Sequence, residues 1–127
     1  MRRLLVLVLV TLAYGAHAAA PCLDSENTLE KSACLNQAIR ERDAKLEQLA
    51  VGIHARLSRM DAEAPMYQTA TAFDKAQAAW KGYRESECDG RRMLWGAGTG
   101  APTAHALCVI ELSDARIEQL QGDRWPK

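Results

Sequence analysis

The chain has 127 residues, with 16 lysines and arginines against 16 aspartates and glutamates, so its formal net charge at pH 7 is zero. A chain of this length forms one domain. The balanced charge argues against nucleic-acid binding, which depends on clustered positive charge.

The chain begins with the features of a secretory signal peptide. Arg2 and Arg3 form a positive n-region, residues 4–13 form a short apolar core, and Ala-His-Ala at residues 16–18 is a small-x-small cleavage site. The core is shorter than the roughly 20 apolar residues that a membrane span needs. We therefore expect cleavage, and no membrane anchor in the mature protein.

We place the cut after Ala18, with Ala19 as the alternative, which makes residues 1–18 the signal peptide and residues 19–127 one mature domain. Cleavage removes two of the 16 basic residues and leaves 14 against 16 acidic ones, a net charge of −2. This charge permits a basic partner. We expect the mature protein to be periplasmic or secreted.

The first predicted helix covers residues 28–60. Its apolar residues recur at intervals of three, four or seven positions, which places them on one helix face. They are Leu35, Ile39, Leu46, Leu49, Ile53, Leu57 and Met60. Asn27 and Glu30 resemble a capping box at its start.

A loop with Pro65 precedes the second predicted helix, at residues 71–89. We expect the hydroxyl of Thr71 to cap this helix and Gly90 to end it. The apolar face of the helix leads to Cys88.

The third predicted helix covers residues 103–121, with Pro102 suited to its first turn and Gly122 at its end. The connection before it, residues 96–100, is rich in glycine and is predicted to be flexible. No strand leads into this connection and no lysine follows it, so it is a loop rather than a phosphate-binding site. With no strand pattern anywhere, the sequence predicts an all-α fold, a small three-helix bundle whose C-terminal tail at Trp125 packs back or frays.

The four cysteines of this exported chain predict two intramolecular disulfides. They are Cys22, Cys34, Cys88 and Cys108. Four cysteines allow three pairings. The two local pairs, Cys22–Cys34 and Cys88–Cys108, are geometrically the easiest and are the ones we expect, although the spacing is also compatible with the crossed pairings.

The residues offer no metal-binding or catalytic pattern. There is no C-x-x-C, and the mature histidines, His54 and His105, are far from any second ligand in the sequence. Neither histidine has an evident nucleophile, and Asp61 and Glu63 lack a partner pattern for acid–base catalysis. We therefore expect no metal, no cofactor and no enzymatic activity.

The stretch AQAAWKGYRESEC, which ends at Cys88, places Trp80 and Arg84 at steps of four before that cysteine, with Tyr83 beside them. A structural interpretation makes Trp80 and Tyr83 core residues. Arg84 then lies over the indole, and its charge pairs with Asp43 of the first helix. The alternative is that these side chains form a surface binding site.

The same residues carry a family resemblance. Cys22 and Cys34 precede A-Q-x-A-W-x-x-Y-R-x-x-x-C, which is followed by Cys108 and by L-S-x-x-R-x-x-x-L, in which the arginine is Arg116. Over nearly all of residues 19–127 this pattern resembles the LprI-type lysozyme inhibitor family, N-terminal domain. The resemblance implies an exported, helical, disulfide-bonded protein in which Arg116 and the other matching side chains are structural. The family usually has threonine at the position of Ser113.

The resemblance implies a binding protein of the cell envelope that inhibits lysozyme-type muramidases by stoichiometric surface binding. Such enzymes carry two carboxylates in a cleft. The flexible loop from Arg91 to Thr103, held at its base by Cys88–Cys108, is a candidate plug. The candidate partner-binding residues are Arg91, Arg92 and His105. Alternatively, acidic side chains attract the rim of a basic enzyme. They are Asp24, Glu26 and Glu30.

The other functional class is a structural or stress-related envelope protein that binds a different partner. An exposed apolar patch, rather than a charged loop, would favour this alternative.

Overall fold

The computed structural model describes residues 20–127, which form four helices: α1 (Ala20–Leu23), α2 (Thr28–Glu63), α3 (Thr69–Met93) and α4 (Ala101–Gln121). No strand occurs among these residues. The predicted all-α bundle of three long helices is confirmed, and only the short α1 was not predicted. The predicted signal peptide, residues 1–18, lies outside the described residues.

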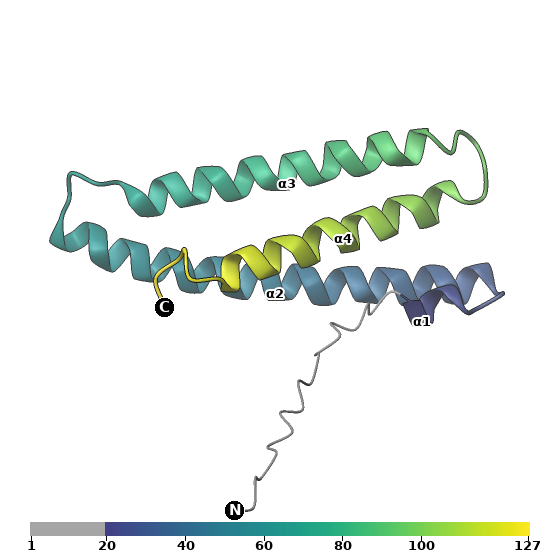
Figure 1. Ribbon diagram of the computed structural model, residues 1–127, viewed down its shortest axis with the longest axis horizontal. Coiled ribbons are helices and arrows are strands. Elements are labelled where there is room, and N and C mark those ends of the chain that lie inside the picture. The colour runs from purple at the N-terminus through teal and green to yellow at the C-terminus, as the bar shows by residue number, and fades with distance from the viewer. Residues whose placement is uncertain (1–19) are drawn as a thin grey trace, which may run out of the picture.

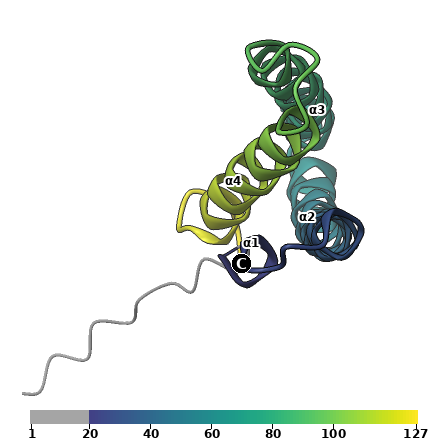
Figure 2. The ribbon, with the colours of Figure 1, turned by 90° about the vertical axis from the view of Figure 1, so that its right-hand side faces the viewer.

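α2 and α4 run in the same direction along the bundle, and α3 runs in the opposite direction (Figure 1). α2 is the longest, and α4 contacts both α2 and α3 (Figures 1 and 2). The start of α2, the end of α3 and the start of α4 therefore lie at one end of the bundle, which we call the open end (Figure 1). α1 folds back beside the start of α2 at this end and is joined to it by the Cys22–Cys34 disulfide.

Half of the predicted capping box is present at the start of α2. Asn27 Oδ1 accepts hydrogen bonds from the backbone N–H groups of Leu29, at 2.9 Å, and Glu30, at 3.4 Å. In a complete capping box the carboxylate of Glu30 would accept from the Asn27 N–H. Here it accepts instead from Ser25 Oγ, at 3.1 Å. Ser25 Oγ in turn accepts from the Asn27 N–H at 3.2 Å, so the serine completes the cap.

The predicted cap of α3 is wrong, because the helix begins at Thr69, before Thr71. Asp61, in the last turn of α2, caps it from across the loop. Its carboxylate accepts from Thr69 Oγ1 at 2.5 Å, from the Thr69 N–H at 3.0 Å and from the Ala70 N–H at 2.9 Å. These bonds, that of the Thr69 hydroxyl first, hold the pKa of Asp61 below its ordinary value.

The predicted end of α3 at Gly90 is also wrong, because the helix continues to Met93. A glycine inside a helix costs about 1 kcal/mol relative to alanine. The additional turn contains Arg91, which makes ion pairs with Glu87 of α3 and Glu111 of α4. The pair with Glu111 joins this additional turn to α4.

The largest cluster of buried side chains lies toward the other end, where α2 and α3 are joined. Its members are Leu46, Ile53, Leu57, Ala70, Phe73 and Leu120. Trp125 packs edge-on against Phe73, with ring centroids 4.8 Å apart. Arg56 Nε also donates to the Pro126 carbonyl at 2.5 Å, so the C-terminal tail packs back on the bundle rather than fraying.

Candidate functional site

The predicted contacts of Arg84 are present and join all three long helices. Its Nη1 donates to Asp43 Oδ1 of α2 at 2.7 Å and to Ser113 Oγ of α4 at 2.8 Å. Its Cζ lies 5.1 Å from the centroid of the Trp80 ring. Ser113 is fully buried and donates to the Val109 carbonyl at 2.6 Å. These side chains therefore hold the fold together.

A second guanidinium approaches the same indole. Arg116 Cζ lies 5.7 Å from the centroid of the Trp80 ring, and Arg116 Nε donates to the buried Gln77 Oε1 at 2.8 Å. Burial lowers the pKa of Arg116 from its ordinary value, because the interior disfavours the charged form. Trp80 is thus half-buried between two cations, and no fully buried side-chain nitrogen or oxygen among residues 20–127 lacks a hydrogen-bond partner.

Tyr83 is not a core residue, which corrects the prediction. Its side chain is 54% exposed. Successive residues of an α-helix are rotated by about 100°. Tyr83 therefore lies about 60° from Trp80, on the side away from Arg84 and Cys88, which turn toward the other helices. Asp43 is likewise half-exposed, although its pair with Arg84 is formed.

A further pair was missed by the sequence analysis. Arg42 is buried in α2 and makes a two-pronged contact with Asp114 of α4, with Nε to Oδ1 at 2.8 Å and Nη2 to Oδ2 at 3.0 Å. Its Nη1 donates to the Ala38 carbonyl at 3.0 Å. The burial of Arg42 could have been predicted from the sequence, because Arg42 is four residues after Ala38 and four before Leu46, on the buried face of α2.

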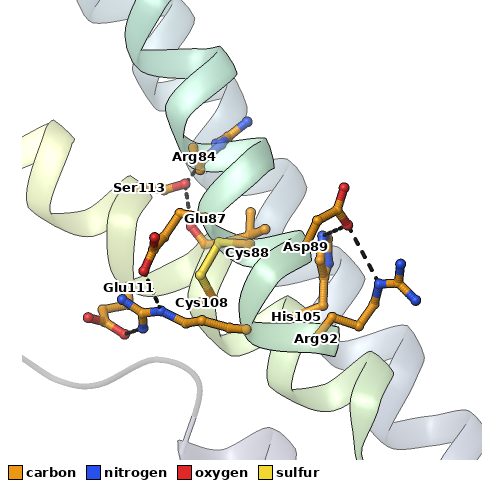
Figure 3. The surroundings of a disulfide bond; sticks show 11 residues. Arg84, Glu87, Cys88, Asp89, Arg92, His105, Cys108, Glu111 and Ser113 are labelled. Carbon is orange, nitrogen blue, oxygen red and sulfur yellow. Dashed lines mark hydrogen bonds and ion pairs between the residues drawn. A yellow bond between two sulfur atoms is a disulfide. The ribbon is translucent and has the colours of Figure 1, made fainter. Parts of the chain in front are cut away.

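Both disulfides have the predicted pairing, and among residues 20–127 no cysteine is free. Cys88 and Cys108 are buried and hold the end of α3 against the start of α4, directly inside the open end (Figure 3). The disulfide thereby fixes where the connection between these helices begins and ends.

A cavity of about 610 Å³ opens at this end, between α2, α3 and α4. Its wall is formed partly by apolar side chains such as Leu35 and partly by polar ones such as Asn36 and Thr103. Arg92 of α3 and His105 of α4 also line it. Two of the three predicted partner-binding residues therefore line this cavity.

Arg92 and His105 meet at one carboxylate. Arg92 Nε lies 3.5 Å from Asp89 Oδ1, and His105 Nε2 lies 3.6 Å from the same oxygen (Figure 3). All three side chains are about half exposed. The structure thus brings together two of the three predicted partner-binding residues, at the wall of an open cavity.

Arg91, the third predicted residue, is engaged elsewhere. Its Nε donates to Glu87 Oε1 at 3.0 Å and its Nη1 donates to Glu111 Oε2 at 2.8 Å. These hydrogen bonds, that of Glu87 first, raise the pKa of Arg91. Arg91 does not line the cavity.

The connection between α3 and α4 is built from consecutive turns. The Trp95 N–H donates to the Arg92 carbonyl at 3.1 Å, and the Trp95 carbonyl accepts from the Gly98 N–H at 3.1 Å. Gly96 has a φ of 56°, a conformation that favours glycine. Neighbouring large apolar side chains are exposed here, a feature that the sequence analysis did not consider. They are Met93, Leu94 and Trp95.

The sequence model described as Lysozyme inhibitor LprI matches residues 19–120. The chain belongs to the LprI lysozyme inhibitor family. No match is found among curated proteins or among solved structures. The matched range contains both disulfides of this LprI-family protein and all the polar contacts around Trp80. The family is named for the inhibition of lysozyme, and the two disulfides are typical of an extracytoplasmic protein.

Inhibition requires binding rather than turnover, so LprI membership agrees with a non-enzymatic role. Elsewhere in this LprI-family protein, His54 Nδ1 lies 2.9 Å from Asp74 Oδ1 beside a hollow of about 400 Å³ between α2 and α3. No cluster of three or more metal-binding side chains occurs among residues 20–127. None of the helices in the same range is both long and apolar enough to cross a membrane.

Proposed function

We propose that this protein inhibits lysozyme-type muramidases by stoichiometric surface binding at the open end, without turnover and without a cofactor. Family membership supports the inhibitory role. The observation that carries the choice of surface is the shared contact of Arg92 and His105 with Asp89, at the wall of the cavity of about 610 Å³. We infer that Arg91, Arg92 and His105 belong to the contact surface.

The chemistry of the target explains why cations are suitable there. A muramidase cleft holds two carboxylates. Arg92 has only a 3.5 Å ion pair, with an exposed neighbour in its own helix, so it can exchange Asp89 for a carboxylate of the partner at little cost. Arg91 would have to leave two shorter pairs, at 3.0 and 2.8 Å. Arg92 is therefore expected to contribute more to binding than Arg91.

The test is a muramidase assay with the purified oxidised protein, comparing the parent with Arg91→Ala, Arg92→Ala and the double variant. Arg59→Ala, an exposed arginine near the far end of α2, is the matched control. Inhibition should be stoichiometric, should not grow after binding equilibrates and should weaken in salt. It should fall most in the double variant and remain unchanged in the control.

Two results would contradict the proposal in different ways. A parent protein that inhibits no lysozyme type at molar excess would reject the function. A double variant that inhibits as well as the parent would reject the contact surface and leave the function standing.

The alternative, an envelope protein with a different partner, is favoured by one observation. Met93, at the end of α3, and Leu94 and Trp95, at the start of the connection to α4, are exposed. An exposed apolar patch is typical of a protein-binding surface. Affinity capture with the oxidised protein, on lysozyme and in parallel on envelope extract, separates the two candidates. Retention of an envelope protein without retention of lysozyme would support the alternative.

A further inference from the structure

Three consecutive large apolar side chains project at the open end. Met93 is 67% exposed, Leu94 is 86% exposed and Trp95 is 60% exposed; we call them the apolar tip. Single exposed apolar residues are common on protein surfaces. A set of neighbouring exposed apolar residues is a feature of binding surfaces, whichever the partner, so the charges around the set have to select the partner.

The apolar tip is held in place by the turns of the connection. Backbone hydrogen bonds bind it on both sides: the Leu94 N–H donates to the Gly90 carbonyl at 3.3 Å, and the Gly98 N–H donates to the Trp95 carbonyl at 3.1 Å. The indole packs directly on Gly100, where an added Cβ would come within 2.8 Å of the Trp95 ring. An exposed indole that is already ordered loses little conformational entropy on binding.

Acidic residues are absent from the segment that contains the apolar tip. No aspartate or glutamate occurs between Asp89 and Glu111, a stretch that contains the whole connection and the first half of α4. Three exposed carboxylates stand at the start of α2 and in the turn before it, at the same end of the bundle as the connection (Figure 1) and across the cavity from it. They are Asp24, Glu26 and Glu30, with Lys31 as the one neighbouring cation. Asp89, also exposed at this end, is paired with Arg92 and His105.

We propose that the apolar tip enters the substrate cleft of a basic muramidase, while the acidic residues at the start of α2 face the basic rim of that cleft. The inference rests on the proposed function and assigns its central contact to Leu94 and Trp95. A segment without carboxylates meets no repulsion from the two catalytic carboxylates of the cleft. Arg92 and His105, which line the cavity at the same end, then lie where they can face those carboxylates.

A lipid bilayer is the other surface that binds exposed apolar and aromatic side chains. The acidic residues at the start of α2 disfavour anionic headgroups, which attract basic rather than acidic segments. The charge pattern therefore selects a cationic protein.

The experiment measures binding of the full oxidised protein to a purified basic lysozyme by titration calorimetry. The variants are Leu94→Ser and Trp95→Ala, and the matched control is Met66→Ser, an 80% exposed apolar residue in the turn at the opposite end. Each tip variant should weaken binding by about thirtyfold or more, as for a central interface residue, and the control should bind like the parent. An N-acetylglucosamine trisaccharide that occupies the cleft should compete with the parent.

Leu94→Ser keeps the inference testable if Trp95→Ala disturbs the turns, because the Leu94 side chain is almost wholly in solvent. Binding by both tip variants that equals the parent, or absence of competition by the trisaccharide, would overturn the inference while the proposed function stands. A parent that neither binds nor inhibits any lysozyme would overturn both. Binding to phosphatidylglycerol vesicles that Leu94→Ser abolishes would also overturn the inference, by assigning the tip to membranes.

Discussion

The guanidinium of Arg84 and the indole of Trp80 are stacked at 5.1 Å, one helical turn apart on α3. The stacked pair lies against both α2 and α4, because Arg84 also bonds to Asp43 and to the buried Ser113. The signature residues of the sequence thus act as structural cross-links, which leaves the surface at the open end available for binding.

Trp80→Ala should lower the free energy of unfolding by about 2–3 kcal/mol, less than a fully buried aromatic because the indole is half-buried. The loss combines packing with two cation–π contacts. Tyr83→Ala, at the exposed neighbouring position, should change stability by only about 0.5 kcal/mol. Denaturant titration followed by circular dichroism measures both. Equal effects of the two variants would contradict this assignment.

Asp114→Ala should destabilise the protein by about 2 kcal/mol, because it leaves the buried guanidinium of Arg42 without its carboxylate. Because Asp114 is partly exposed, we expect a smaller loss of stability than for a fully buried ion pair. Arg42→Met, which keeps an apolar stem and removes the charge, should cost less than Asp114→Ala. A double-mutant cycle with both changes measures the coupling, and additive losses would show that the pair contributes nothing.

Asp61 makes stability depend on pH at the start of α3. Because its carboxylate accepts three hydrogen bonds, its folded pKa lies below the ordinary value of 3.8. The stabilisation that the Asp61 cap gives the folded protein is therefore fully present above the pKa of Asp61 in the unfolded chain. It is lost as the pH falls through the pKa of Asp61 in the folded protein. Denaturant titrations of the parent and Asp61→Ala between about pH 2 and 7 should converge at the acid end. A constant difference across that range would contradict the assignment.

The two disulfides should be reduced in a fixed order. Cys34 is exposed, whereas Cys88 and Cys108 are buried, so a limiting thiol reagent reaches Cys22–Cys34 first. Thiol trapping and peptide mass mapping should detect free Cys34 before free Cys88. Loss of Cys88–Cys108 should nevertheless reduce inhibition more, because this bond holds the connection that carries the apolar tip. Inhibition that is equally sensitive to both bonds would contradict that role.

The mature protein should begin at Ala19, after export and removal of residues 1–18. Intact mass measurement of the protein recovered from the cell envelope or the medium tests this directly. An intact N-terminus, or a protein found only in the cytoplasm, would contradict the signal-peptide prediction.

The sequence by itself determined that the chain forms three long helices, and it made the two local disulfides the expected pairing without excluding the crossed ones. Apolar spacing at the helical period marks the buried faces of α2, α3 and α4, and each disulfide joins segments that are close along the chain. The contact of Arg84 with Trp80 was also predictable, because residues four apart on a helix are neighbours.

Only the tertiary structure decided which residues meet across helices. Arg42 pairs with Asp114, 72 positions away, and His105 reaches the carboxylate that Arg92 shares. Both contacts depend on how far each helix is shifted along its neighbours, and helical periodicity carries no information about that shift. The position of Asp61 at the start of α3 has the same origin. Periodicity identifies the face of a helix, but packing against the other two helices determines what that face touches.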